Sequence, residues 1–108
     1  MTGKGVEQDY TEAAKWIKKA AEQGNTAAQI NLGTMYIYGH GVPQDYAEAA
    51  RWTRKAAEQG NVAAQHNLGN MYSDGLGVPK NISMARYWYQ KAADQGLEAA
   101  IEALKDLE

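Results

Sequence analysis

The chain has 108 residues and a mass of 11.8 kDa, which is enough for one domain and too little for two. Its 11 lysines and arginines against 13 aspartates and glutamates give a formal net charge of −2, which argues against a protein that coats nucleic acid or acidic membranes. Cysteine is absent, so disulfides, zinc–thiolate sites and thiol catalysis are excluded. There is no run of the ~20 apolar residues that span a membrane, and no signal peptide at the start. We therefore expect a soluble domain, cytoplasmic by default unless an export signal has been removed.

The predicted elements are all helices, and they follow one another in pairs. A flexible segment is expected at residues 1–4. Turn residues then divide the chain into six helical stretches, at 10–23, 26–38, 46–59, 62–73, 82–95 and 97–107. The predicted fold class is therefore all-α.

Sequence signals mark where these helices begin and end. Asp45 and Glu48 have the spacing of a capping box, in which each side chain bonds a backbone amide at the start of the helix. Asp9 and Glu12 repeat that spacing before the first helix. Glycines at 24, 60 and 96 suit the left-handed position that ends a helix, and asparagines at 25 and 61 suit the next N-cap.

The same residues return along the chain with a period of 36. Trp16, Trp52 and Trp88 keep this step, and 25 of the 36 positions are identical between the first two units. The units are 5–40, 41–76 and the shorter, more divergent 77–108. We treat 5–108 as a single repeat domain.

A unit of this kind needs its neighbours to bury its apolar faces. One helix pair cannot cover both of its sides, whereas stacked pairs can, which predicts a short superhelical solenoid. Gly33 and Gly69 lie inside helices, where a glycine costs roughly 1 kcal/mol against alanine, so we expect close helix contacts at both. The three tryptophans are expected in the core.

The residues that recur in register resemble a known family. Leu32, Gly33 and Tyr36 return as Leu68, Gly69 and Tyr72, with Gly-x-Gly-Val, Trp and Lys-Ala-Ala segments at matching places. This pattern is similar to the Sel1-like repeat, a relative of the tetratricopeptide repeat with a slightly longer loop. The resemblance implies a right-handed α-solenoid of antiparallel helix pairs, about six helices in 36-residue repeats, that acts as a non-catalytic scaffold or adaptor.

The candidate binding surface comes from the positions at which the first two units differ. Four of these differences are spaced i, i+4, i+7 and i+8, which places them on one stripe of the helices 26–38 and 62–73. In tetratricopeptide-like solenoids the first helix of each pair lines the concave surface, so the resemblance implies that this stripe faces an inner groove. The predicted partner-binding residues are Ile30, Thr34, Ile37, Tyr38, His66, Asn70, Ser73 and Asp74.

The chemistry of this stripe favours a protein or peptide segment as the ligand. It grades from apolar and aromatic residues at one end to polar and acidic residues at the other. Asn70 can bond a peptide backbone, and Asp74 with Glu102 and Asp106 would attract a lysine or arginine. The competing interpretation is ordinary variation on an exposed face, without a ligand.

Other functions have weaker support in the sequence. His40 and His66 are the only histidines, there is no phosphate-binding loop of the Gly-Lys-Ser/Thr form, and no Ser-x-x-Lys occurs, so we expect no enzyme, cofactor or metal. Nucleic acid and membrane insertion are not expected either.

The second hypothesis is a self-associating module. The helix 10–23 lacks a preceding partner, so its side formed by Tyr10, Ala13, Ala14 and Ile17 is expected to be partly exposed and to pair with a second copy. The last helix carries polar replacements such as Lys105, as a terminal cap requires. A designed or excised array without a ligand of its own would explain the same features.

Overall fold

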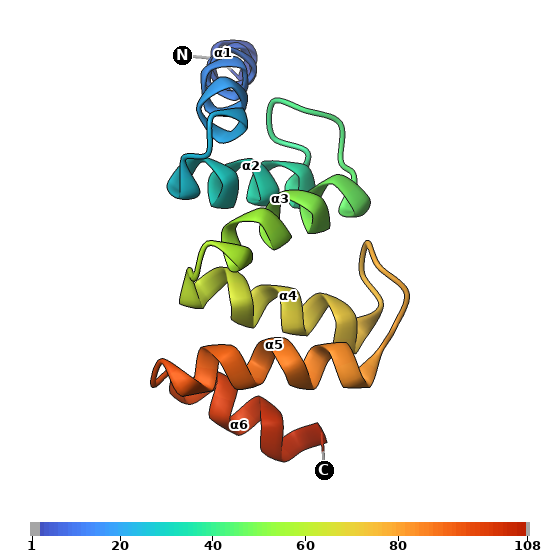
Figure 1. Ribbon diagram of the computed structural model, residues 1–108. Coiled ribbons are helices and arrows are strands. Elements are labelled where there is room, and N and C mark those ends of the chain that lie inside the picture. Colours follow the sequence, from blue (N-terminus) through green and yellow to red (C-terminus); the bar gives the residue numbers. More distant parts are fainter. Residues whose placement is uncertain (1–2, 108) are drawn as a thin grey trace.

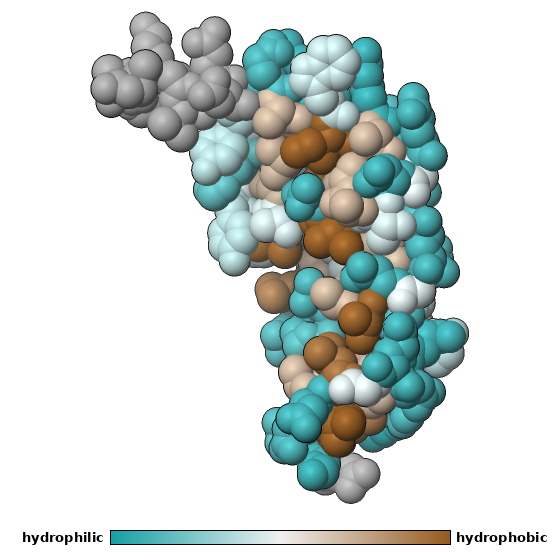
Figure 2. Space-filling view, turned by 90° about the vertical axis from the view of Figure 1, so that its left-hand side faces the viewer, coloured by the Kyte–Doolittle hydropathy of each residue, from teal (hydrophilic) through white to brown (hydrophobic). Residues whose placement is uncertain are grey.

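The computed structural model describes residues 3–107, and these form six α-helices in a single stack (Figure 1). The helices are α1 (Gly3–Glu22), α2 (Thr26–Tyr38), α3 (Tyr46–Glu58), α4 (Val62–Asp74), α5 (Ile82–Asp94) and α6 (Glu98–Leu107). Each helix packs mainly against the next one along the chain, and the stack measures 48 × 24 × 23 Å. The predicted all-α solenoid is confirmed. Its surface is curved, with a convex right-hand edge in Figure 2 and apolar side chains gathered along the middle of the face shown.

Five helices lie within one residue of their predicted bounds, and side-chain caps hold the beginning of four of them. The side chains of Asn25 and Asn61 accept hydrogen bonds from amides three residues later, at 2.8 and 2.9 Å. Asp45 and Asn81 do the same before α3 and α5, at 3.1 and 3.0 Å. Each bond satisfies a backbone donor that the helix itself leaves unpaired.

The second half of the predicted capping box is not formed at α3. Glu48 binds Arg51, with a nitrogen–oxygen distance of 3.0 Å, and the amide of Asp45 donates to the carbonyl of Tyr36. The start of α3 is thus tied to α2 rather than to its own glutamate.

Helix α1 differs from the sequence prediction because it begins at Gly3, whereas 10–23 was expected. Residues 39–45 carry a similar sequence and form a loop, in which Gly39 and Gly41 have φ of 71° and 80°. That loop is held by the bond from Asp45 to Tyr36 of the preceding helix. Residues 3–9 are instead helical and continue directly into the rest of α1. Of the predicted flexible segment 1–4, residues 1 and 2 lie outside the described residues.

The core lies between successive helices and is built from alanines with a few large side chains. Leu32 and Leu68 are fully buried, and Trp52 and Trp88 are 2% and 4% exposed. The expected close contacts at the helical glycines are present: a Cβ at Gly33 would lie 3.0 Å from the Thr53 hydroxyl. Trp16 is the exception to the predicted core, because 68% of it is exposed.

Glutamine side chains join successive units on the side of the stack that carries the short turns 23–25, 59–61 and 95–97. The Gln59 amide donates to the Gly24 carbonyl at 3.1 Å and to the Gln29 side chain at 2.8 Å. Gln95 repeats both bonds one unit later, to Gly60 and Gln65. Each unit is therefore fixed to the previous one by the same pair of side-chain bonds as well as by its core.

None of the described helices is long and apolar enough to cross a membrane.

Candidate functional site

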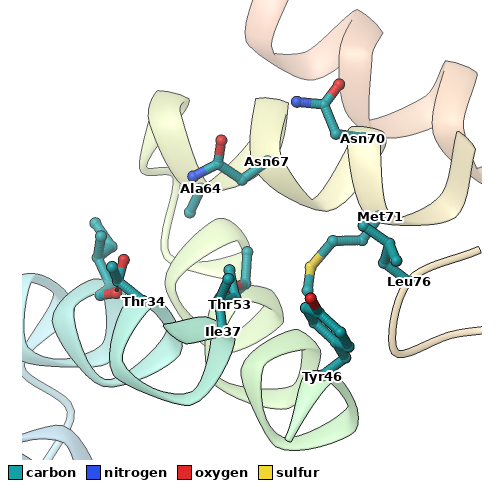
Figure 3. Close-up of a pocket in the computed structure, with 10 residues that line it drawn as sticks. Thr34, Ile37, Tyr46, Thr53, Ala64, Asn67, Asn70, Met71 and Leu76 are labelled. Carbon is teal, nitrogen blue, oxygen red and sulfur yellow. Dashed lines mark hydrogen bonds between the residues drawn. The ribbon is translucent and has the colours of Figure 1, made fainter. Parts of the chain in front are cut away.

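A pocket of about 190 Å³ opens between α2, α3 and α4 (Figure 3). Helix α2 gives one wall, α4 gives the opposite wall, and the beginning of the loop after α4 closes one end. The lining residues are Ile30, Thr34, Ile37, Tyr46, Thr53, Ala64, Asn67, Asn70, Met71 and Leu76. The pocket thus joins neighbouring repeats, which is where a solenoid can form a surface that no single unit has.

The apolar part of the pocket continues the core out to the surface. Ile30 and Ile37 are partly buried against the main core cluster, to which the buried Met71 belongs. In Figure 3 the side chains of Met71 and Tyr46 point toward one another. Leu76 and Tyr46 are 41% and 40% exposed, so the apolar lining remains open to solvent. Such a lining favours an apolar side chain as its occupant.

The polar part of the pocket comes from two asparagines of α4. Asn67 and Asn70 lie on the same helix one turn apart, and Figure 3 shows both carboxamides on the same side of it. The hydroxyl of Tyr89 in α5 donates to Oδ1 of Asn70 at 2.5 Å, which fixes the orientation of that amide. The amide therefore has a defined donor side and a defined acceptor side.

Two acidic side chains act electrostatically on the Tyr89 hydroxyl. Burial raises the pKa of Tyr89 above its ordinary value, and the negative charges of Asp74 and Asp106 raise it further. A hydrogen bond with Ser73 acts in the opposite direction. Two of the predicted acidic residues, Asp74 of α4 and Asp106 of α6, thus act on the Tyr89 hydroxyl at the end of the stripe.

The structure divides the predicted site residues into two groups. Ile30, Thr34, Ile37 and Asn70 line the pocket. The other four do not line it: the His66 ring packs 5.8 Å from the Tyr89 ring, and Ser73 and Asp74 also lie near Tyr89. Tyr38 is 64% exposed and stacks on His40 at a centroid distance of 5.8 Å. That all eight residues bind a partner stays a prediction.

Sequence comparison between the units missed six lining residues. Tyr46, Asn67 and Met71 are identical to Tyr10, Asn31 and Met35 one unit earlier, so a search for differences passes over them. Ala64 is likewise unchanged from Ala28. Thr53 and Leu76 do differ between units, but one lies on the second helix of its pair and the other in a loop, away from the selected stripe.

The histidines make aromatic contacts. The His40 ring stacks on Tyr10 at 4.8 Å as well as on Tyr38. Within the part of the chain that the structure describes, no three His, Asp or Glu side chains gather as metal ligands would.

Solved structures of similar fold include three bacterial proteins. A Sel1 repeat protein from Oxalobacter formigenes is 43% identical, with a TM-score of 0.86 over 91% of this chain and 29% of its own. A protective antigen of uropathogenic Escherichia coli with an SLR fold is 50% identical, with a TM-score of 0.83 over 91% of this chain and 21% of its own. Cysteine-rich protein B of Helicobacter pylori is 29% identical, with a TM-score of 0.81 over 86% of this chain and 70% of its own.

The chain spans less than a third of the length of the first two of these proteins. A comparison with curated protein sequences finds no match. The Sel1 repeat family matches at residues 1–25, 26–61 and 62–97, so its units have the predicted period but begin at the first residue of α2 and of α4. With nearly the whole length matched and the helices stacked as in these structures, the chain belongs to the Sel1 repeat family.

Proposed function

We propose that this chain binds a segment of another protein, with one apolar side chain of that segment in the pocket between α2, α3 and α4. Sel1 repeat proteins generally mediate protein–protein interactions, and the family is generally non-catalytic. The observation that carries the proposal is the pocket itself, in which an apolar lining open to solvent meets two asparagine amides.

The size of the pocket favours a polypeptide over a small molecule. Pockets for drug-sized ligands have volumes of ~300–1,000 Å³ and bury most of the ligand. The present pocket, at about 190 Å³, is smaller. It has room for a side chain, while the rest of a peptide would lie across the outer surface.

The polar groups indicate how the peptide backbone would be held. Because Asn70 accepts a bond from Tyr89, its NH₂ group is the part that can donate to a peptide carbonyl. Asn67, one turn earlier, offers a second amide on the same wall. Asp74 and Asp106 would favour a lysine or arginine beyond the apolar anchor, since exposed opposite charges select partners and speed their encounter. The exposed ring of Tyr38 would extend the contact surface.

A displayed library of random 12-residue peptides tests the proposal on the full chain. We expect enrichment of peptides with an aliphatic residue and a nearby lysine or arginine. A Thr34→Trp variant fills the pocket without burying a charge, and Ile37→Asp places a charge in its wall. Both should weaken the enriched peptides at least tenfold in fluorescence anisotropy, with the helical circular dichroism signal retained.

An Ile82→Asp variant is the matched control, because Ile82 is 36% exposed at the start of α5 and does not line the pocket. It should bind like the unmodified chain. Equal binding by the Thr34→Trp, Ile37→Asp and unmodified chains would refute the pocket as the binding site.

Self-association through α1 is the second candidate function. It is favoured by exposed aromatic side chains of α1, since Trp16 and Tyr10 are 68% and 41% exposed. Of the other residues on the predicted side, Ala13 and Ile17 are partly buried and Ala14 is buried. Light scattering at high micromolar concentration tests it, and a mass of one chain would count against it.

A further inference from the structure

One position in helices α3 and α5 carries side chains of very different size. Thr53 and Tyr89 are 36 residues apart in the sequence and are therefore equivalent in neighbouring units. Both are buried, since only 7% and 4% of them are exposed. Thr53 nevertheless lines the pocket between α2, α3 and α4 (Figure 3), because a threonine fills much less space than a tyrosine.

The Tyr89 side chain is enclosed by residues of α4. A Cβ at Gly69 would lie 2.6 Å from its ring, and the centroid of the His66 ring lies 5.8 Å from its own. Its hydroxyl donates to Oδ1 of Asn70 at 2.5 Å, and a further hydrogen bond joins it to Ser73. Between α4 and α5 the chain thus fills this space with a side chain of its own.

The equivalent residues of α2 form one wall of the open pocket. Three side chains lie 36 residues before those around Tyr89, and they are Ile30, Thr34 and Ile37. Because Thr53 has no ring, the space that these residues enclose is left open. A cavity of ~150 Å³ can hold a benzene ring. The pocket, at about 190 Å³, is therefore large enough for the group that Tyr89 supplies one unit later.

The walls of the two spaces differ in polarity. Around Tyr89, a carboxamide and a serine hydroxyl provide partners for the phenol hydroxyl. In the pocket, Ile37 stands at the position of that serine and has no polar atom in its side chain. The hydroxyl of Thr34, at the position of the carboxamide, already donates to the carbonyl of Ile30 at 3.1 Å. A phenol placed here as Tyr89 is placed would lose both partners, whereas an aliphatic side chain needs none.

We propose that the pocket selects a leucine or isoleucine of the partner, and that Thr53 is the residue that permits this selection. Tyr89 is the chain's own occupant of the equivalent space, so the residue at this position decides whether a junction receives a side chain from outside. The inference rests on the proposed function. It adds which side chain of the bound segment is chosen and which residue of α3 controls the choice.

The first test changes the size of residue 53 in the full chain. Thr53→Tyr supplies the ring that the next unit has, so it should weaken the enriched 12-residue peptides about tenfold or more in fluorescence anisotropy. Thr53→Val is the matched control, because valine has the shape of threonine and leaves the pocket open. It should bind these peptides like the unmodified chain. Circular dichroism and the urea midpoint show that both variants are folded.

The second test exchanges the aliphatic anchor of an enriched peptide for tyrosine. The unmodified chain should bind the tyrosine peptide about tenfold more weakly or worse. A triple variant gives the α2 wall the side chains that surround Tyr89, and its changes are Ile30→His, Thr34→Asn and Ile37→Ser. This variant should bind the tyrosine peptide more tightly than the unmodified chain does.

The outcomes separate this inference from the proposed function. If Thr34→Trp abolishes binding while Thr53→Tyr binds like the unmodified chain, the inference is wrong and the proposed function stands. Equal affinity of the unmodified chain for the aliphatic and tyrosine peptides would also overturn the inference. A library that yields no bound peptide, or peptides whose binding Thr34→Trp does not change, would refute the proposed function and the inference with it.

Discussion

Two glycines at equivalent positions have different neighbours, and this difference determines what a methyl group would do at each. A Cβ at Gly69 would lie 2.6 Å from the Tyr89 ring, which is buried and held by its bond to Asn70. A Cβ at Gly33 would meet the Thr53 hydroxyl at 3.0 Å, and that side chain is small. The repeat keeps both glycines, but the space around them is set by the residue opposite.

We predict that Gly69→Ala destabilises the protein by about 1–3 kcal/mol, because the Tyr89 ring must move out of a packed site. Gly33→Ala should change stability by less than ~1 kcal/mol, because the better helix propensity of alanine offsets the tight contact. Urea unfolding followed by circular dichroism measures both. An equal loss in the two variants would mean that the residue opposite the glycine does not matter.

Tyr89 also predicts a dependence of stability on alkaline pH. Burial and the nearby Asp74 and Asp106 raise its pKa in the folded chain. Above the ordinary tyrosine value of about 10, the unfolded chain loses this proton first, so the free energy of unfolding falls as pH rises toward the folded pKa. Tyr89→Phe should reduce the loss between about pH 9 and pH 11. The Tyr87→Phe variant, which changes an exposed tyrosine, should not reduce this loss. Urea titrations of both variants at the two pH values give the free energies of unfolding to be compared.

At the scale of the helix, the sequence predicts an element well when its signals are local. Asn25, Asn61 and Asn81 cap the helices that follow them, and those helices begin where expected. The beginning of α1 is different. The sequence of residues 3–9 resembles that of the loop 39–45, and this loop is held by a hydrogen bond from Asp45 to Tyr36 of the preceding helix. A local pattern cannot report whether that helix is present.

This difference gives a prediction for two aspartates with the same sequence context. Asp45→Ala should cost about 1 kcal/mol, because Asp45 caps α3. Asp9→Ala should be neutral, because residue 9 lies inside α1 rather than before it. Thermal unfolding measures the loss of stability in each variant. An equal loss in both would place the beginning of α1 at residue 10.

The candidate site was predicted in part for a related reason. The comparison of units finds side chains that vary along one helix face, and it gave Ile30, Thr34, Ile37 and Asn70 of the pocket. The rest of the lining comes from the next helix, from a loop and from residues that every unit keeps. Which of these lining residues come together depends on how one unit packs on the next. The helical periodicity of the sequence does not contain this information.

At the scale of the whole molecule, stability should decrease from the middle of the stack toward α1. The larger core cluster spans α3 to α5, and α1 is covered on one side only. In a solenoid each unit is stabilised mainly by its neighbours, so a terminal helix opens most easily. Hydrogen exchange should be fastest in α1 and slowest in α4 and α5. Uniform protection across all six helices would indicate a single cooperative unit.

The glutamine bonds between units have a consequence for how such genes change length. Gln59 and Gln95 contact the unit before them through identical atoms, 36 residues apart. Unequal recombination that inserts or removes one such coding segment within the array would rebuild the same junction at the new boundary, wherever the crossover falls. Gain or loss of an internal copy should therefore leave these glutamine junctions unchanged.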